Sequence, residues 1–231
     1  MKNGTTEPSF LINLKLLQTL MKPLLNLFLA LILTGCNSPI IADLVTLPGQ
    51  PFYQDDFSNP SSGWTTMEDD NGSLGYSEGA YKMLVESAIY DIRSLSGHTF
   101  KDAQIEVDAT RLAGPVDNRF GLICRFQDID NYYVFIISSD GYYAIGKIKN
   151  GIATLLGQEM MAFNNSILQG EGTNHLRFDC VGDTLKGSVN GNPLALTNDA
   201  DFSTGDAGLV TGAFEEGGVE ISFDNFMVYK P

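Results

Sequence analysis

The stretch FGLICRFQDIDNYYVFIISSDGYYAIGKI, residues 120–148, decides the fold of this chain. It holds three runs of aromatic and β-branched residues, and such residues favour β-strands. Two polar breaks separate the runs, DIDN at 128–131 and DG at 140–141. An Asp-Gly pair between apolar runs is a strong hairpin signal, because a two-residue turn needs positive φ at both central positions. The stretch therefore predicts a three-stranded antiparallel ribbon.

The two breaks also predict a register for this ribbon. A turn at Asp140-Gly141 pairs Phe135 with Gly146, and a break at Ile129-Asp130 places Cys124 opposite Phe135. Alternation then gives a core face made of Leu122, Cys124, Phe126, Tyr133, Phe135 and Ile137. The other face mixes apolar and hydrogen-bonding groups, namely Ile123, Arg125, Gln127, Tyr132, Val134, Ile136, Tyr143, Ile145 and Lys147. A slip of one residue would exchange the two sets on the slipped strand.

The rest of the chain after residue 50 has the same character. Residues 100–112 alternate apolar and polar side chains, as a half-buried strand does. Further short runs of this kind recur every 8 to 12 residues between turn signals, and no segment after residue 36 shows a helical period. This pattern predicts an all-β domain over residues 51–231, a sandwich or barrel of antiparallel strands.

The N-terminal segment has the pattern of an export signal. Lys22 precedes an apolar run at 24–33, and small residues lead to Gly35-Cys36. The end of this run resembles a bacterial lipobox, in which the cysteine is acylated and becomes the new N-terminus. We therefore expect residues 1–35 to be a lipoprotein signal peptide, with Cys36 lipidated. The alternative is a plain secretory signal with an incidental cysteine.

Three further expectations concern the N-terminal region. Residues 36–50 contain two prolines and no clear period, as a tether does. Translation starts either at Met1 or at Met21, which begins a natural signal sequence of its own; residues 1–20 are an over-extended start in the second case. With a lipidated Cys36, the domain would be held on a membrane outside the cytoplasm.

Charge and cysteine content limit the functional classes. The chain has a net charge of −14, so its surface should repel nucleic acids and anionic lipid headgroups. Besides Cys36 it contains Cys124 and Cys180, both at core-facing strand positions. In an exported protein these two predict one disulfide bond. Two buried free thiols are the alternative.

A family resemblance emerges from turn and core motifs across residues 52–230. The motifs are Asp56-Phe57, Gly63-Trp64, residues 118–126, Asp130 to Tyr133, Asp140 to Tyr142, Asn190-Gly191, Gly205 with Gly208-Leu209, and Phe223 to Phe226. In these motifs the chain resembles the concanavalin A-like jelly-roll domains, and among them the laminin-G-like and 3-keto-disaccharide-hydrolase-type domains of exported bacterial proteins. The resemblance implies a jelly-roll sandwich of two antiparallel sheets, with sugars bound on a concave sheet and, in some members, a structural calcium ion.

Candidate ligand-binding and metal-binding residues follow from these patterns. Aromatic rings beside planar hydrogen-bonding groups suit sugar recognition, which predicts a ligand site made of Arg125, Gln127, Tyr132, Tyr143 and Lys147. The resemblance places the first and last strands side by side, where carboxylates could hold structural Ca²⁺; the candidates are Asp55, Asp56 and Asp224, with Asp128 and Asp130 as a second option. The alternative is that these aspartates cap turns.

Catalytic motifs are weak in this sequence. Laminarinase-type jelly rolls carry Glu-x-Asp-x-x-Glu on one strand, and here Glu106-Val107-Asp108 is followed by Arg111 where the second glutamate belongs. Only His98 and His175 are available for a zinc site or a nucleophile's base. We therefore expect a lipid-anchored module that binds a glycan or another surface ligand without catalysis. A carbohydrate-active enzyme and a structural or adhesion domain are the alternatives.

Overall fold

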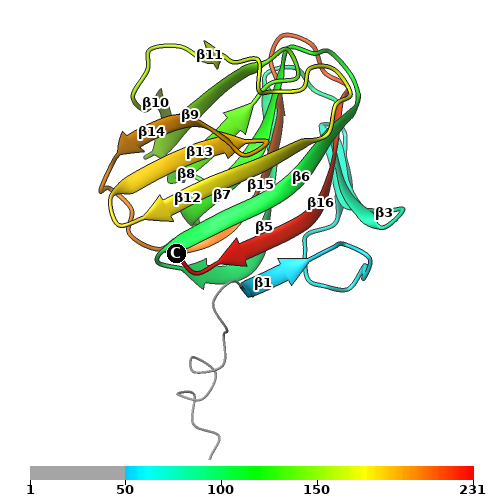
Figure 1. The fold of residues 1–231 in the computed structure, drawn as a ribbon. Helices are drawn as coiled ribbons and strands as arrows, with labels where there is room; N and C mark the ends of the chain where they lie inside the picture. Colours follow the sequence, from blue (N-terminus) through cyan, green and yellow to red (C-terminus); the bar gives the residue numbers. More distant parts are fainter. Residues whose placement is uncertain (1–49) are drawn as a thin grey trace, which may run out of the picture. The chain divides into compact units, whose positions relative to one another are not determined.

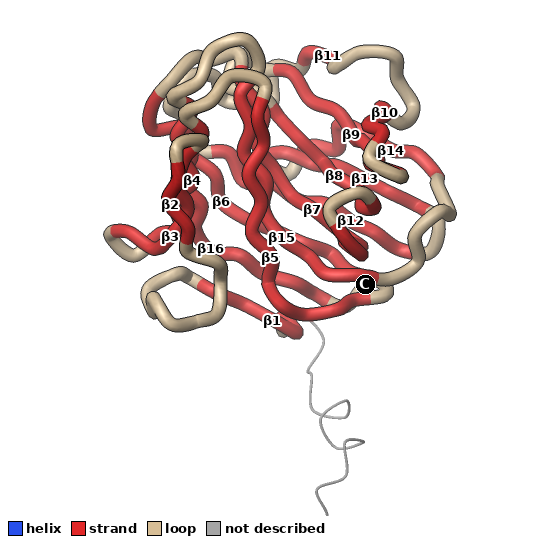
Figure 2. Tube along the Cα trace, turned by 180° about the vertical axis from the view of Figure 1, so that it is seen from behind, coloured by secondary structure: helices blue, strands red, loops and turns tan. Residues whose placement is uncertain are grey.

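The structure, a computed structural model, describes residues 50–231. Those residues form sixteen β-strands joined by turns and loops, and no helix occurs among them. The strands lie in two antiparallel sheets, so the predicted all-β sandwich is confirmed. Figures 1 and 2 show the sandwich from opposite sides. Within the described residues, nothing resembles a helix long and apolar enough to span a bilayer.

The first sheet, called sheet A here, has nine strands in the order β14-β13-β12-β6-β16-β4-β3-β2, with β1 paired to β16. The bounds are β1 Pro51–Asp55, β2 Met67–Asp69, β3 Gly72–Ser77, β4 Ala80–Val85, β6 Ala103–Ala113, β12 Asn174–Val181, β13 Thr184–Val189, β14 Asn192–Asn198 and β16 Val219–Tyr229. The first and last strands are therefore neighbours, as the family resemblance implied. The short strands β2 and β3 form a hairpin at the edge of this sheet.

The second sheet, sheet B, has seven strands in the order β10-β9-β8-β7-β15-β5, with β11 also paired to β9. The bounds are β5 Tyr90–Phe100, β7 Asn118–Asp128, β8 Asn131–Ile137, β9 Tyr142–Lys149, β10 Ile152–Leu155, β11 Ala162–Phe163 and β15 Gly205–Ala213. The ribbon quoted above is thus β7, β8 and β9, which make up the middle and one side of sheet B.

The core lies between the two sheets. Alternation on β6 buries Ala103, Ile105, Val107 and Ala109, the face that the sequence assigned to the core. On β7 and β8 the buried inward residues include Leu122, Cys124, Tyr133, Phe135 and Ile137. These are five of the six residues predicted for the core face. Trp64, the only tryptophan, also belongs to this core.

The predicted pairing of β7 with β8 is wrong by two residues. Cys124 lies opposite Tyr133, and Leu122 lies opposite Phe135. Because side chains alternate with a period of two, this error leaves Leu122 and Cys124, which precede the irregularity in the pairing, on the predicted core face. The prediction is wrong for Phe126, which follows that irregularity and packs with Tyr132 on the opposite face of the sheet.

The predicted pairing of β8 with β9 is wrong by one residue, and this error does change faces. The loop contains three residues, Ser139 to Gly141, because the Ser138 N–H donates to the Tyr142 carbonyl oxygen at 2.8 Å. Gly141 takes the left-handed conformation, with φ of 100°, that commonly ends a three-residue hairpin loop. Asn118, fully buried, holds this loop by accepting the Ser139 N–H at 3.0 Å. Tyr143 and Ile145 consequently pack on the core side.

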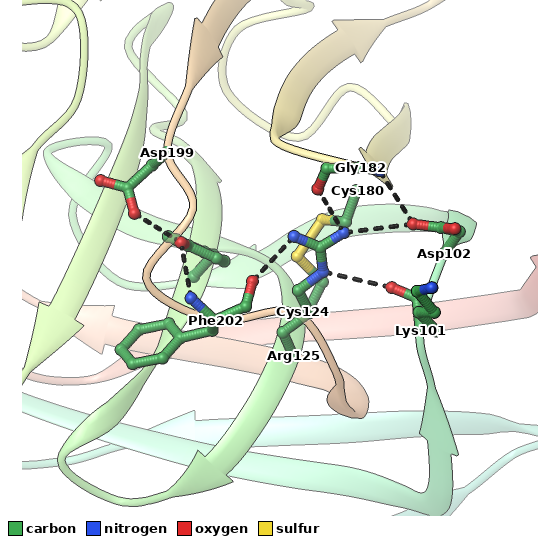
Figure 3. The surroundings of a disulfide bond; sticks show 9 residues. Lys101, Asp102, Cys124, Arg125, Cys180, Gly182, Asp199 and Phe202 are labelled. Atoms are coloured by element: carbon green, nitrogen blue, oxygen red, sulfur yellow. Dashed lines mark hydrogen bonds and ion pairs between the residues drawn. A yellow bond between two sulfur atoms is a disulfide. The ribbon is translucent and has the colours of Figure 1, made fainter.

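A disulfide joins Cys124 of β7 to Cys180 of β12 and so links the two sheets, as predicted. Arg125 follows in the left-handed region, with φ of 52°, at a β-bulge where the pairing of β7 with β8 is interrupted. Figure 3 shows its guanidinium beside the disulfide, bonded to the carbonyl oxygens of Lys101, Phe202 and Gly182. The disulfide is typical of a protein outside the cytoplasm.

Candidate glycan-binding groove on sheet B

A groove lies on the face of sheet B that points away from sheet A, called the groove face here. Its volume is about 390 Å³, within the range of small-ligand sites. Strands β5, β7, β8, β9, β10 and β15 all contribute to its lining. The lining residues are Asp91, Arg119, Tyr132, Val134, Ile136, Gly146, Lys147, Ile148, Ala153, Thr154, Leu155, Val210 and Phe214.

An ion pair crosses the sheet at one end of this groove. Arg119 of β7 donates from Nε to Asp91 Oδ1 of β5 at 2.6 Å. The two strands are not neighbours, because β15 runs between them and places Gly212 opposite both residues. A Cβ atom at Gly212 would lie 1.7 Å from Asp91 Oδ1. The pair therefore forms only because the middle strand carries a glycine at this position.

The ion pair is held in place by a neighbouring ring, and both of its side chains can still form further hydrogen bonds. The Arg119 guanidinium carbon lies 4.5 Å from the centroid of the Phe214 ring, a cation–π contact. The side chains of Arg119 and Asp91 are 17% and 32% exposed, so solvent or a ligand can reach both. Among the described residues, no group forms a hydrogen bond or an ion pair with the second carboxylate oxygen of Asp91, Oδ2. A sugar hydroxyl could donate to that oxygen and accept from the guanidinium.

Tyr132 forms the polar end of an apolar floor. Its ring packs against Phe126 at 5.4 Å and belongs to the cluster of Ile123, Val134 and Val210 on the groove face. Its hydroxyl accepts a hydrogen bond from Arg93 Nε at 2.9 Å. Burial raises the pKa of Tyr132 above its ordinary value of 10.0, and the nearby arginines oppose this rise only in part. The hydroxyl therefore keeps its proton at neutral pH and can donate it to a ligand.

The predicted ligand residues do not all reach this face. Tyr132 lines the groove and Gln127 is exposed beyond the bulge. Arg125 is 3% exposed and bonds to backbone carbonyls near the disulfide, because the bulge redirects its side chain. Tyr143 packs against the core between the sheets. The prediction that the five residues share one face is therefore wrong for Arg125, Tyr143 and Lys147.

Lys147 lies on the opposite face from the predicted one, because the pairing of β9 with β8 differs from the prediction by one residue. It lies opposite Tyr133, a core residue, and its Nζ bonds to Asp201 at 2.6 Å and to Asp199. Asp199 in turn accepts a hydrogen bond from the Tyr133 hydroxyl at 2.5 Å. Lys147 borders the groove, but its ammonium group is committed to this network.

The three candidate calcium ligands are engaged locally. Asp55 accepts the Phe57 N–H at 2.8 Å and the Trp64 indole N–H at 3.0 Å. Asp56 accepts the Ser58 N–H at 3.0 Å, and Asp224 accepts the Asn225 N–H at 2.7 Å. Among residues 50–231, no three or more His, Cys, Asp or Glu side chains are grouped as metal ligands. The donor set predicted for calcium is thus not assembled, and calcium binding stays a prediction.

The acidic strand considered for catalysis lies on the other sheet. Glu106 and Asp108 are on β6 of sheet A, where their side chains point outward. Glu106 bonds to Arg177 at 3.2 Å, and Asp108 bonds to His175 at 2.8 Å and to Asn225 at 3.0 Å. His175 is in strand β12, next to β6 in the sheet. These acids therefore form an ion-pair network away from the groove face.

Sequence reasoning missed Asp91 and Arg119, which are the main polar groups of the groove. Both occupy outward positions of their strands, but they are 28 residues apart and no motif joins them. The signal that links them is Gly212, another 93 residues beyond Arg119 in the chain. Only the strand order β7-β15-β5 shows that these three residues occupy one row across the sheet.

Comparisons with known proteins establish the fold but not the family. No protein-family model matches the chain, and no curated protein matches it. Among solved structures, it is similar to the carbohydrate binding module CBM66 from Bacillus subtilis, with 21% identity and a TM-score of 0.59. That match covers 73% of this chain and 96% of the module.

Two further similar structures come from Bacillus licheniformis. A β-glucanase is 13% identical with a TM-score of 0.58, and the match covers 80% of this chain and all of the enzyme. The GH43 protein BlXynB is 14% identical with a TM-score of 0.57; the match covers 76% of this chain and 39% of that protein. At these identities the likeness shows the concanavalin A-like jelly-roll fold alone.

Proposed function

We propose that this chain is a carbohydrate-binding module that is anchored to a membrane outside the cytoplasm and binds a glycan in the groove of sheet B. The observation that carries the proposal is the Asp91–Arg119 ion pair at the end of an apolar floor. Sugars present apolar ring faces edged by hydroxyl groups. The groove offers the matching surfaces, with apolar strand residues below and charged hydrogen-bonding groups at one end.

The arrangement of Asp91 and Arg119 suits hydroxyl recognition in particular. A carboxylate accepts hydrogen bonds and a guanidinium donates them, so the pair can bind two neighbouring hydroxyls at once. Charged partners give stronger hydrogen bonds than neutral ones. Both side chains are fixed before the ligand arrives, by each other and by Phe214, which lowers the entropic cost of binding.

The groove favours binding over hydrolysis. A glycosidase of the usual type needs two carboxyl groups on either side of the scissile bond. The lining residues of the groove include one carboxylate, Asp91, and that carboxylate is paired with Arg119. Support for a carbohydrate ligand also comes from the solved structures of the same fold, since one is named a carbohydrate binding module and another a β-glucanase.

Membrane anchorage is the second part of the proposal. It rests on the leader sequence ending at Gly35-Cys36 and on the Cys124–Cys180 disulfide, which is typical of exported proteins. Lipidation of Cys36 would leave residues 37–50 as the link between the bilayer and the domain. A glycan-binding module in this position would bring the membrane surface into contact with a polysaccharide.

A glycan array tests the carbohydrate part, with the purified chain and its Arg119→Ala variant as probes. We expect binding to one class of glycan and a loss of about tenfold or more in affinity for the variant, because a charged hydrogen-bonding group contributes roughly 1.5–3 kcal/mol. Arg177→Ala is the matched control, since Arg177 is in a comparable ion pair on the outer face of sheet A. Absence of binding across the array, or equal binding by wild type and Arg119→Ala, would refute the proposal.

The enzymatic alternative is tested with the same material. Incubation with labelled oligosaccharides, including 3-keto-disaccharides, should leave the glycosidic bonds intact if the module only binds. Cleavage that disappears in Asp91→Asn would instead assign catalysis to the groove.

A further inference from the structure

An exposed pair of aromatic rings lies on sheet B outside the groove. Tyr142 on β9 is 40% exposed and Phe163 on β11 is 48% exposed. The two residues are opposite each other in the strand pairing, and their ring centroids are 5.5 Å apart at an interplanar angle of 68°. Because Tyr143 packs into the core, its neighbour Tyr142 projects from the groove face. The aromatic pair and the groove are therefore on the same side of the sandwich.

The pair shares a cross-strand row with the ion pair of the groove. Asp91, Gly212 and Arg119 are successive partners on β5, β15 and β7. Phe120 lies opposite Ile137, which places Arg119 beside Ser138. The Ser138 N–H donates to the Tyr142 carbonyl oxygen, so the row continues to β9 and then to β11. Since neighbouring strands are about 4.8 Å apart, Tyr142 is about 10 Å from Arg119 across the sheet.

The aromatic pair is held rigidly without a ligand. The Asn164 N–H donates to the Gly141 carbonyl oxygen at 2.9 Å, and the Gly170 N–H donates to the Ser139 carbonyl oxygen at 2.8 Å. These bonds fasten the segment that carries Phe163 to the β8–β9 loop. The Phe163 ring also packs against Gly141, where a Cβ atom would lie 2.6 Å from the ring. Two exposed rings fixed in this way form a preorganised stacking surface.

We propose that Tyr142 and Phe163 form a second sugar subsite, which stacks on a ring further along the glycan chain bound at Arg119. This inference rests on the proposed function and specifies its ligand class as an oligosaccharide or polysaccharide. A single sugar ring is too short to contact both Arg119 and Phe163. A chain that runs across the strands of sheet B can hydrogen-bond at the ion pair and stack on the exposed rings.

The test measures affinity against ligand length by isothermal titration. The probes are cello-, xylo-, laminari- and fructo-oligosaccharides, each from the monosaccharide to the hexasaccharide, and the protein is the full chain. We expect wild type to gain affinity as the ligand becomes long enough to reach the aromatic pair. Tyr142→Ala and Phe163→Ala should each lose about tenfold for long ligands and keep wild-type affinity for the shortest ligand that binds.

Two control variants separate stacking from general damage. Phe163→Tyr keeps an aromatic ring and should retain the gain with length. Leu196→Ala removes an apolar side chain that is 70% exposed on β14 of sheet A, and it should bind as wild type does. Circular dichroism and thermal unfolding establish that each variant is folded, which is expected because both rings are substantially exposed.

The outcomes distinguish the two proposals. If both alanine variants keep the full gain with length, the second subsite is wrong and the groove is unaffected. If the alanine variants weaken the shortest ligand as much as the longest, the pair is not a separate subsite. If wild type binds no oligosaccharide of any length, both the proposed function and this inference fail.

Discussion

Gly212 is the residue on which the groove depends. It has no side chain, so Asp91 and Arg119 can meet above the strand that separates them. Its backbone is not in the left-handed region, and alanine is therefore acceptable to the backbone. What alanine disturbs is the ion pair, because its Cβ would lie 1.7 Å from Asp91 Oδ1 and 2.7 Å from Arg119 Nε.

We expect Gly212→Ala to weaken glycan binding strongly and to destabilise the fold by about 1–3 kcal/mol, the usual range for overpacking. Titration with the glycan found on the array and urea unfolding measure the two effects. Gly75→Ala on β3 is the control, since a Cβ there meets only Thr66 at an ordinary 3.5 Å. Unchanged affinity in Gly212→Ala would mean that the ion pair does not contact the ligand.

Asp199 makes the stability of the fold depend on pH in the acidic range. Burial alone would raise the pKa of Asp199, but hydrogen bonds from Lys147, Tyr133 and the Asp201 N–H lower it below its ordinary value of 3.8. A carboxyl group with a lowered pKa in the folded state contributes stability above its unfolded pKa. That contribution is lost as the pH falls through the folded pKa.

We therefore expect Asp199→Asn to lower the unfolding temperature at pH 7, where the carboxylate is ionised. The difference between wild type and variant should shrink as the pH falls below about 3.8, because wild type then loses the same charge. Thermal unfolding across this range measures the difference. A gap that stays constant or widens in acid would contradict the role assigned to Asp199.

At the scale of the strands, the β7–β8–β9 ribbon shows what the sequence could predict. Alternation identified the strands and five of the six core-face residues, because an error of two residues in the pairing leaves a side chain on the same face. Phe126 is the exception, since the pairing shifts between Cys124 and Asp128. The β8–β9 error was one residue, since Asp140-Gly141 signals a tight turn but does not specify two residues or three. The added loop residue is fixed by Asn118, which lies 21 positions away in the sequence.

The bulge at Arg125 could not be predicted from the ribbon alone. Arg125 alternates as an outward residue would, yet three carbonyl oxygens from other segments surround its guanidinium. Those partners come from loops at Lys101, Gly182 and Phe202 that only the folded sandwich brings together, as Figure 3 shows. The main polar residues of the candidate site could not be predicted for the same reason. Asp91, Gly212 and Arg119 form a row only through the order of the strands in the folded sheet. Tyr132 was found because it lies within the ribbon.

The disulfide is a covalent link between the two sheets, and we expect it to stabilise the fold. Cys124 and Cys180 are 56 residues apart, which corresponds to about 4 kcal/mol in the chain-entropy model. We expect the Cys124→Ala, Cys180→Ala double variant to unfold at a clearly lower urea concentration than wild type. Wild type treated with reductant should behave like the double variant, whereas equal midpoints for all samples would show that the link adds no stability.

At the scale of the whole molecule, the two outer faces differ in kind. The outer face of sheet A carries a network of ion pairs in which Arg177 binds both Glu106 and Asp179. The groove face of sheet B carries an apolar hollow, one ion pair, and Arg93, for which no carboxylate partner is found among residues 50–231. The combination of an apolar hollow with an ion pair is the reason that we propose the groove face as the ligand-binding face.

The anchor is a separate prediction about the whole molecule. Expressed in a bacterium, the full chain should partition into the detergent-rich phase of a Triton X-114 extract, because acyl chains attach at Cys36. Cys36→Ser should move the protein to the aqueous phase or leave the precursor uncleaved. Mass spectrometry of the mature N-terminus identifies the acylated residue. A mature wild-type chain without acyl groups would favour the plain secretory signal.

The central claim is that the ligand is a glycan and that it binds on sheet B. Amide chemical-shift mapping of the labelled protein, titrated with the saccharide found on the array, tests this claim directly. We expect the largest shifts at residues around Asp91, Arg119, Tyr132 and Phe214, with little change on β6 and β12. Shifts concentrated at Glu106, His175 and Arg177, or no shifts with any saccharide, would contradict it.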